Sequence, residues 1–391
     1  MKKNRTPNNQ PSMIGPDRLD YFQSRLDSLL STICEFVEIE SPSDNKAALD
    51  RMSGFLAEKF ARLGGRSQFH RANQYGDNLQ IDFPGAANLK PVLLLGHFDT
   101  VYPVGTLAKM PCHADGGRLH GPGVLDMKSG IALMLSAIEA LQSWHGQLPR
   151  PVTVFLVSDE EIGSYSSRKI TENLARQSAG VLVLEPAGPR GAVKTARKGV
   201  GEYTLTVKGV ASHAGLDPGK GHSAIVELAR QIEAIWKLND LNSGVSVNPG
   251  IIRGGTRTNV IASEAVAEID VRIKTAKQAA GLDRKLGALK PFDKHCKLSV
   301  EGKINRLPME RTKGVAALYE KARAVAGEIQ WKLDEAAVGG GSDGNFTAGI
   351  GIPTLDGLGA LGDGAHATYE HIMISELPRR ALLLAGMIEA V

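Results

Sequence analysis

The chain of 391 residues is poor in cysteine and in aromatic residues, with 3 cysteines and 5% aromatic residues. The odd number and wide spacing of Cys34, Cys112 and Cys296 favour free thiols in a reducing compartment over a disulfide framework. No apolar stretch reaches the length of a membrane span, and no basic cluster indicates nucleic-acid binding. The polar, basic arm at residues 1–10 lacks the apolar segment of a signal peptide. We therefore expect a cytoplasmic protein that uses neither nucleic acid nor membrane as a partner.

The pattern of apolar residues predicts two structural units, as the chain length allows. Helical spacing predicts helices over 19–37 and 46–63, and strands then alternate with helices to about residue 200. That alternation is typical of an α/β fold with a mostly parallel sheet. From residue 202 the order becomes strand, helix, strand, strand, helix, strand, which is the ferredoxin-like plan. We predict one α/β domain formed by 1–201 and 314–391, with an inserted ferredoxin-like α+β domain at 202–313.

Imidazole and carboxylate side chains follow several apolar runs that predict buried strands. The carboxyl ends of strands in an open α/β sheet face the crevice where such sheets bind ligands. A Gly/Pro turn before an apolar helix and a glycine-rich loop near the C-terminus add one acid and one histidine. The set is His97, Asp99, Asp126, Asp159, Glu160, Glu161, Glu185 and His366. Adjacent carboxylates repel one another in a dry site, and donors of this kind without thiolate bind zinc or a similar borderline cation.

These segments resemble the co-catalytic dizinc peptidases and deacylases that include carboxypeptidase G, acetylornithine deacetylase and succinyl-diaminopimelate desuccinylase. The similar segments keep the family's order and cover nearly the whole chain after about residue 20. They are Gly96–Val101, Gly121–Gly130, Asp159–Gly163, Leu184–Pro186, Ala211–Gly215, and His366 with Glu370. Within the family the chain most resembles carboxypeptidase G, because Gly339–Gly344 is similar to its late glycine-rich loop.

The resemblance implies a centre of two divalent metal ions, with zinc as the first choice and cobalt or manganese as alternatives. The implied ligands are His97, Asp126, Glu161, Glu185 and His366. Asp126 matches the carboxylate that bridges the two ions, and the family implies a cis peptide bond after it. Two ions that share one carboxylate and one water lower the pKa of that water and polarise a carbonyl group.

Two further acids near the implied ligands match residues with other roles. Glu160 matches the general base, and Asp99 matches the acid that orients His97. A base for hydrolysis has to lie beside the water without being a ligand, which suits one of two neighbouring glutamates. A metal-bound imidazole usually donates its other N–H to a carboxylate, and Asp99 lies two positions after His97.

The inserted domain and the late glycine loop supply the implied substrate contacts. His213 matches the histidine that reaches across a dimer interface to the substrate carbonyl oxygen, so the resemblance implies a homodimer. Asn259 and Arg272 match substrate-binding positions, and Gly340 would let backbone N–H groups approach a carboxylate closely. Without the family resemblance, His213 would be an ordinary loop histidine, Arg272 a surface strand residue, and the turn at Gly340 a plain flexible turn.

The expected function is that of a zinc-dependent metallocarboxypeptidase, an amidohydrolase that cleaves the amide bond to a C-terminal amino acid with a free carboxylate. In the family, a glutamate at the Glu185 position accompanies carboxypeptidases and deacylases. The alternative is an N-acyl amino acid deacylase of the acetylornithine deacetylase type, so the substrate is a small peptide or an N-acyl amino acid. The basic stretch Ala196–Val200 either adds cationic contacts or is a solvated turn.

Two other classes of protein fit less well. A metal-dependent binding protein that has lost catalysis would lack the base, yet Glu160 is present. A serine enzyme of the α/β-hydrolase type requires a Gly-x-Ser-x-Gly elbow, and we expect none in this chain.

Overall fold

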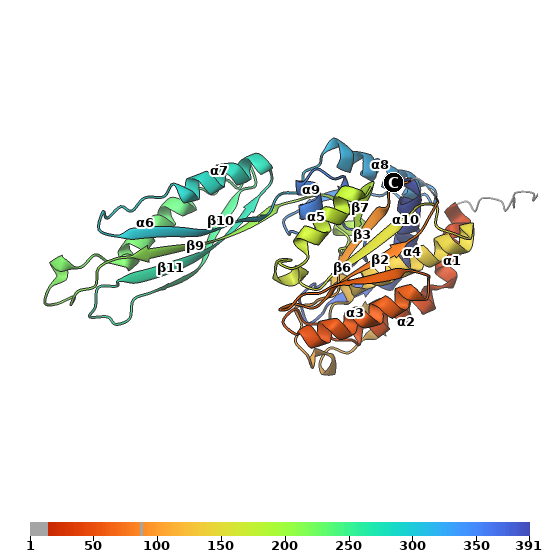
Figure 1. Ribbon diagram of the computed structural model, residues 1–391, viewed down its shortest axis with the longest axis horizontal. Helices are drawn as coiled ribbons and strands as arrows, with labels where there is room; N and C mark the ends of the chain where they lie inside the picture. The colour runs from red at the N-terminus through yellow and green to blue at the C-terminus, as the bar shows by residue number, and fades with distance from the viewer. Residues whose placement is uncertain (1–14, 87–88) are drawn as a thin grey trace, which may run out of the picture.

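The computed structural model describes residues 15–86 and 89–391 and has two lobes of unequal size (Figure 1). A six-stranded sheet in the order β1-β2-β6-β3-β7-β14 forms the centre of the larger lobe. β6, β3, β7 and β14 pair in parallel, whereas β1 and β2 form an antiparallel edge. The strands span Arg66–His70 (β1), Asn78–Phe83 (β2), Val92–His97 (β3), Val152–Val157 (β6), Gly180–Val183 (β7) and Thr354–Leu355 (β14). The prediction of a mostly parallel α/β sheet is confirmed. The polar arm expected at residues 1–10 lies outside the described residues.

Helices cover both faces of this sheet, because successive side chains of its strands point to opposite faces. Leu94 of β3 belongs to the core that packs against α2, α3, α4, α8 and α10, while Leu93 and Leu95 pack on the other face with α5. The helices of this lobe span Gly15–Ser24 (α1), Leu26–Val37 (α2), Lys46–Ala61 (α3), Ser129–His145 (α4), Arg168–Gln177 (α5), Lys313–Gly327 (α8), Gly344–Gly349 (α9) and Leu377–Ala390 (α10).

The single helix expected over 19–37 is wrong, since the chain leaves the helical conformation at Arg25. The break has a packing reason: α1 lies against α10, and α2 lies against α4.

Two small sheets connect segments that are distant in the sequence. β8 (Val193–Arg197) pairs in parallel with β13 (Glu335–Val338). The other sheet has the order β15-β16-β5-β4, and its strands span Gly362–Asp363 (β15), His371–Met373 (β16), Arg118–His120 (β5) and His113–Asp115 (β4). This second sheet brings the C-terminal part of the chain beside the segment that leads to Asp126.

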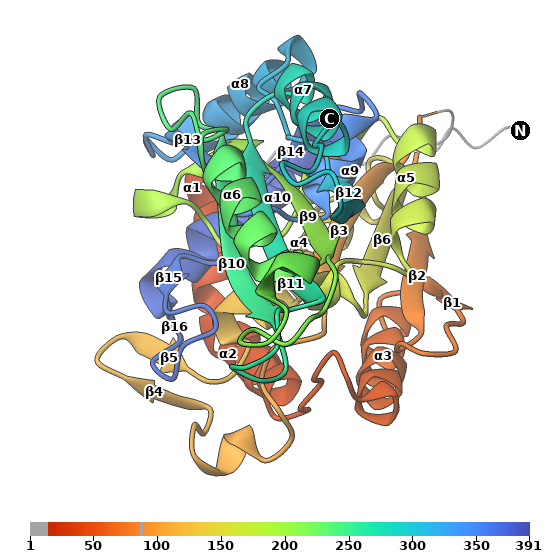
Figure 2. The same ribbon diagram turned by 90° about the vertical axis from the view of Figure 1, so that its left-hand side faces the viewer.

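The small lobe is an antiparallel sheet with two helices and a hydrophobic core of its own. Its elements follow the order β9 (Gly199–Lys208), α6 (Ala224–Trp236), β10 (Ser246–Gly254), β11 (Glu264–Ile273), α7 (Ala276–Gly287) and β12 (Lys297–Arg306). The sheet order β10-β11-β9-β12 is that of a ferredoxin-like unit, so the predicted inserted fold is confirmed. Figure 2 views the molecule from the small-lobe end. The predicted boundary after residue 201 falls inside β9, and the domain boundaries themselves stay predictions.

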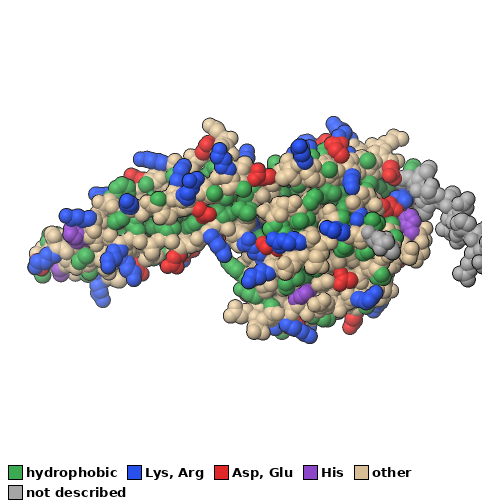
Figure 3. All heavy atoms as spheres, turned by 45° about the horizontal axis from the view of Figure 1, so that its top comes forward, with side chains coloured by type: hydrophobic (Ala, Val, Ile, Leu, Met, Phe, Trp, Pro, Cys, Tyr) green, Lys and Arg blue, Asp and Glu red, His purple; other side chains and the backbone are tan. Residues whose placement is uncertain are grey.

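The surface gives no indication of a single dominant charge on the face drawn in Figure 3, where Lys and Arg side chains are interspersed with Asp and Glu. Within residues 15–86 and 89–391, none of the helices combines the length and the apolar composition that crossing a bilayer requires. The cytoplasmic location stays a prediction.

Candidate active site

Three neighbouring parallel strands bring acidic and imidazole side chains to one edge of the central sheet. His97 is the last residue of β3. Glu160 and Glu161 lie in the short 3-10 turn η3 (Glu160–Ile162) after β6, and Glu185 follows β7. Because β6, β3 and β7 are adjacent and parallel, their carboxyl ends meet at the same crevice. The sequence pattern predicted this convergence.

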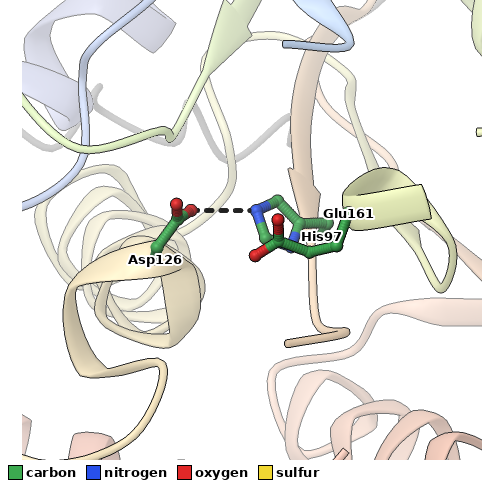
Figure 4. Close-up of side chains that lie close together, drawn as sticks. All are labelled: His97, Asp126 and Glu161. Atoms are coloured by element: carbon green, nitrogen blue, oxygen red, sulfur yellow. Dashed lines mark hydrogen bonds and ion pairs between the residues drawn. The ribbon is translucent and has the colours of Figure 1, made fainter. Parts of the chain in front are cut away.

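Asp126 lies between two imidazoles, in the turn η2 (Val124–Lys128) that precedes α4. Its Oδ1 is 3.0 Å from Nε2 of His97, and its Oδ2 is 3.4 Å from Nε2 of His366. Figure 4 shows Asp126 facing His97, with Glu161 beside them. The peptide bond from Asp126 to Met127 is cis, as the family resemblance predicted.

A second carboxylate accompanies each imidazole. Glu185 Oε1 lies 3.6 Å from Nε2 of His97, and Glu161 Oε1 lies 3.1 Å from Nε2 of His366. Donor atoms of His97, Asp126 and Glu161 all lie within 4.8 Å of one another. The five predicted ligand residues therefore form two groups that share the carboxylate of Asp126.

The electrostatics of this group fit a cationic centre. Hydrogen bonds to Asp126 and Glu161 raise the pKa of His366 to about 10. Burial raises the pKa of Glu185 to about 7, and the neighbouring Asp126 carboxylate adds to the rise. Cations placed among these carboxylates would relieve their repulsion. Imidazole and carboxylate donors without thiolate suit zinc and similar divalent cations, so the residues present fit a pair of such ions.

Asp99 connects His97 to the turn that carries the two glutamates. Nδ1 of His97 lies 3.0 Å from the backbone oxygen of Asp99 and 3.4 Å from its Oδ1. The carboxylate also accepts hydrogen bonds from the backbone N–H groups of Glu160 and Glu161, both at 3.2 Å, and from the hydroxyl of Ser43 at 2.7 Å. The imidazole of His97 thus forms its hydrogen bond with the backbone of Asp99 and has the carboxylate within ion-pair distance, while the carboxylate also fixes η3; the orienting role of that carboxylate stays a prediction.

Glu370 holds the Asp126 turn, a role that the sequence did not indicate. Its fully buried carboxylate accepts backbone N–H groups from Gly123 at 3.1 Å, Leu125 at 2.7 Å and Asp126 at 3.0 Å. The hydroxyl of Tyr102 donates to it at 2.6 Å. Since Glu370 follows His366 by four positions, one short C-terminal segment supplies an imidazole and the anchor for the shared carboxylate.

The contacts of Arg197 show whether the basic stretch Ala196–Val200 adds cationic contacts or is a solvated turn. It is buried, and it donates to Oε2 of Glu185 at 3.2 Å and to both carboxylate oxygens of Asp356 at 2.7 and 2.9 Å. It also donates to the backbone oxygen of Gly340 at 3.2 Å. The stretch is therefore not a solvated turn, and its cationic contact is with a proposed metal ligand and with the glycine loop.

Arg306, the last residue of β12, was missed by the sequence analysis. Its Nη2 donates to Oε1 of Glu160 at 2.9 Å, to the hydroxyl of Ser164 at 2.8 Å and to Oδ1 of Asp343 at 3.1 Å. Burial raises the pKa of Glu160, whereas the charge of Arg306 lowers it. β12 leads from the small lobe back to the large lobe, and its last residue therefore contacts Glu160, the proposed base.

The three predicted small-lobe residues do not form one group within the chain. His213 is exposed between β9 and α6, and its segment lies beside that of Asn259, whose backbone oxygen accepts the N–H of Ala214 at 2.9 Å. Arg272 lies near the other end of the sheet, opposite Val200, and pairs with Asp270 at 2.9 Å. In the described part of the chain, no hydrogen bond or ion pair joins His213, Asn259 or Arg272 to the large lobe.

His213 is nevertheless held in a defined tautomer. Its Nδ1 accepts the backbone N–H groups of Gly215 at 3.1 Å and Leu216 at 3.0 Å. The proton of the neutral ring therefore lies on Nε2, which leaves that nitrogen as a hydrogen-bond donor.

The glycine loop 339–344 contradicts one expectation from the sequence analysis. The string Gly340-Gly-Ser-Asp-Gly344 has the form Gly-x-Ser-x-Gly, so the expectation that the chain contains none is wrong. The hydroxyl of Ser342 is buried, donates to Asp356 at 2.6 Å, and has no histidine partner among the described residues. The pattern is therefore not a serine nucleophile. A Cβ at Gly340 would meet open space, so packing does not demand glycine there, and its substrate role stays a prediction.

An α/β sheet with imidazole and carboxylate donors at its strand ends, joined to a ferredoxin-like unit, defines a metal-dependent hydrolase. The chain belongs to the peptidase family M20/M25/M40, whose family model matches residues 93–390. It is 29% identical over 381 residues to carboxypeptidase G2 of Pseudomonas sp. (strain RS-16), covering 94% of this chain and 91% of that protein. It is 30% identical over 314 residues to succinyl-diaminopimelate desuccinylase of Paracidovorax citrulli (strain AAC00-1), covering 75% of this chain and 79% of that protein.

Solved structures show the same fold. The aminopeptidase PepT of Bacillus cereus ATCC 10987 superposes with a TM-score of 0.77 at 24% identity, over 93% of this chain and 98% of that one. The family and the fold predicted from the sequence are thus confirmed, and the roles of the individual site residues stay predictions.

The Glu370→Gln variant tests the anchoring of the Asp126 turn. The amide places an NH2 group where the carboxylate accepts backbone N–H groups, so we expect zinc affinity to fall by roughly 10- to 100-fold. Isothermal titration of the metal-stripped protein measures the affinity. The control is Glu320→Gln, an exposed glutamate on α8 that pairs with Arg323 three positions along the same helix. Zinc affinity equal to that of the control would contradict the anchoring role.

Proposed function

We propose that this chain is a dimetal carboxypeptidase that hydrolyses the amide bond to a C-terminal amino acid with a free carboxylate. The observation that carries the proposal is the different surroundings of two adjacent glutamates. Glu161 lies among the proposed ligands, 3.1 Å from His366, whereas Glu160 accepts a 2.9 Å hydrogen bond from Arg306. In this proposal Glu161 would hold metal, and its neighbour Glu160 would be left for proton transfer.

The proposed metal ligands are His97, Asp126, Glu161, Glu185 and His366. Two divalent ions bound there, zinc in the first place, would lower the pKa of a shared water and polarise the substrate carbonyl. Asp126 would bridge them, since each of its carboxylate oxygens faces a different imidazole. Asp99 and Glu370 would keep His97 and Asp126 in position through their buried hydrogen bonds.

Glu160 would act as the general base. Its carboxylate takes a proton from the attacking water while the new C–O bond forms, and it returns that proton to the amine nitrogen as the C–N bond breaks. Burial favours the protonated form that exists between these two transfers, and Arg306 favours the charged form that starts and ends the cycle. This balance suits a group that has to gain and lose a proton in each turnover.

The substrate class rests on the glycine loop and on sequence similarity. Arg197 donates to the backbone oxygens of Gly340 and Gly341, at 3.2 and 3.0 Å, and so fixes the loop beside Glu185. Backbone N–H groups of a glycine loop can approach an α-carboxylate closely. Similarity to carboxypeptidase G2 over 94% of the chain favours a carboxypeptidase. The second candidate is an N-acyl amino acid deacylase, which the similarity to a succinyl-diaminopimelate desuccinylase supports.

We further propose a homodimer in which His213 serves the partner's site. The Nε2–H group of His213 is an available donor, and the loop that carries it, between β9 and α6, belongs to the small lobe, which extends away from the sheet that carries the proposed ligands (Figure 1). Such a donor could stabilise the oxyanion formed at the attacked carbonyl. Asn259 lies beside it and would bind the same substrate, whereas Arg272 would contact substrate from the other end of the sheet.

A panel of substrates tests the proposed reaction. The zinc-loaded protein is assayed with N-acyl glutamates, folate analogues and acetylated amino acids, each with a free and with an amidated α-carboxylate. We expect the amidated form of the best substrate to react at least about 100-fold more slowly, because a site that binds a carboxylate rejects the neutral analogue. Equal rates on both forms, or cleavage only at a free N-terminus, would contradict the carboxypeptidase assignment.

Substitution of the two glutamates separates their roles. Glu160→Gln should retain its metal content and lose about 100-fold or more in kcat, the usual scale for a general base. Glu161→Gln should lose metal affinity together with activity. Elemental analysis and steady-state kinetics on the same preparations measure both quantities. Near-normal turnover of Glu160→Gln would show that another group is the base.

Complementation tests the dimer. Inactive His213→Ala and inactive Glu160→Gln are mixed in equal amounts and allowed to exchange subunits. Half of the dimers are then mixed and contain one intact site, so activity should return to about a quarter of the wild-type value. Native mass spectrometry verifies the exchange. Complete exchange without recovered activity would place His213 in the site of its own chain, and an active monomer would exclude the dimer.

A further inference from the structure

Two of the three cysteines meet in the large lobe although 78 positions separate them. Cys34 lies on α2, and Cys112 precedes β4 by one residue. Their Sγ atoms are 3.0 Å apart, about 1 Å more than the length of a disulfide bond. Both side chains are half-buried and reduced. The third cysteine, Cys296, is buried in the core of the small lobe.

The pair lies at a junction that supports the active site. A Cβ added to Gly121 would lie 2.8 Å from Val37 of α2 and 3.5 Å from the Cα of Cys112, so α2, Cys112 and Gly121 are in close contact. The backbone oxygen of Gly121 accepts the N–H of Val124, and the N–H of Gly121 donates to the backbone oxygen of Glu370. α2 also packs directly against η2, the turn that carries Asp126.

We propose that Cys34 and Cys112 form an oxidisable dithiol whose disulfide links α2 to the β4–β5 hairpin beside the Asp126 turn. The oxidant class is a hydroperoxide. One sulfur attacks the peroxide O–O bond and becomes a sulfenic acid, with release of water or an alcohol. The other sulfur displaces the sulfenic oxygen as water, so the peroxide takes up the two electrons and both thiol protons.

The surroundings also predict how the pair behaves before oxidation. Burial raises the pKa of the Cys112 thiol, and the hydrogen bond to Cys34 adds to the rise. The thiolate is the reactive form, so we expect oxidation to be slower than that of an exposed cysteine and faster at alkaline pH. A disulfide here would close a long loop that includes His97 and Asp99, and the folded state would gain stability because the unfolded chain loses freedom.

The test follows the three thiols of the full-length protein. Reduced wild type is treated with hydrogen peroxide, quenched with N-ethylmaleimide, and analysed by intact mass and peptide mapping. We expect a loss of two hydrogens, one alkylatable thiol instead of three, and a peptide that joins Cys34 to Cys112. The melting temperature should rise by roughly 5 °C and fall again when the disulfide is reduced.

Matched variants keep the result interpretable. Cys296→Ser should form the same cross-link, whereas Cys34→Ser and Cys112→Ser should not form it and should keep the melting temperature of the reduced wild type within a few degrees. The peptide map of the wild-type protein identifies the cross-link even if one of these variants folds poorly. Oxidation that yields only intermolecular disulfides, or only oxidised Cys296, would overturn the proposal. A Cys34–Cys112 cross-link without any rise in melting temperature would overturn its stabilising role.

Discussion

Repulsion among carboxylates that share one crevice is the constraint on which the rest of this structure depends. Asp126, Glu160, Glu161 and Glu185 all lie at the carboxyl edge of the central sheet. Burial disfavours their charged forms and raises the pKa of each glutamate, whereas hydrogen bonds with the two neighbouring imidazoles lower the pKa of Asp126. The imidazoles of His97 and His366 lie between three of these carboxylates, those of Asp126, Glu161 and Glu185. Arginine side chains contact Glu160 and Glu185. A pair of divalent cations would complete this compensation, which explains why a protein maintains such an arrangement.

The fold meets this constraint by bringing together segments from most of the chain. Parallel strands place His97 and the glutamates at one edge without any local signal for their contact. The four-stranded sheet β15-β16-β5-β4 then brings His366 and Glu370 beside the Asp126 turn, although about 240 positions separate them. The small lobe contributes Arg306 at the end of its last strand. A displacement of that lobe would therefore change the hydrogen bond between Arg306 and Glu160.

The sequence predicted those features that have a local pattern. Apolar runs that end in acids located β3, β6 and β7, and the strand and helix order identified the ferredoxin-like unit. Most contacts of Arg306, Arg197 and Glu370 could not be predicted, because the paired residues lie more than a hundred positions apart in the sequence and no local pattern indicates them. The break at Arg25 was missed for the same reason, since packing on two different helices causes it. The metal identity, the substrate and the dimer depend on groups outside the single chain.

The most direct test of the dimetal account is anomalous diffraction from crystals of the protein loaded with zinc, with data collected on both sides of the zinc absorption edge. The account predicts two peaks roughly 3.5–4 Å apart, with Asp126 between them. One peak should lie beside His97 and Glu185, and the other beside Glu161 and His366. A single peak, or a metal ion bound by Glu160 in place of Glu161, would contradict the account.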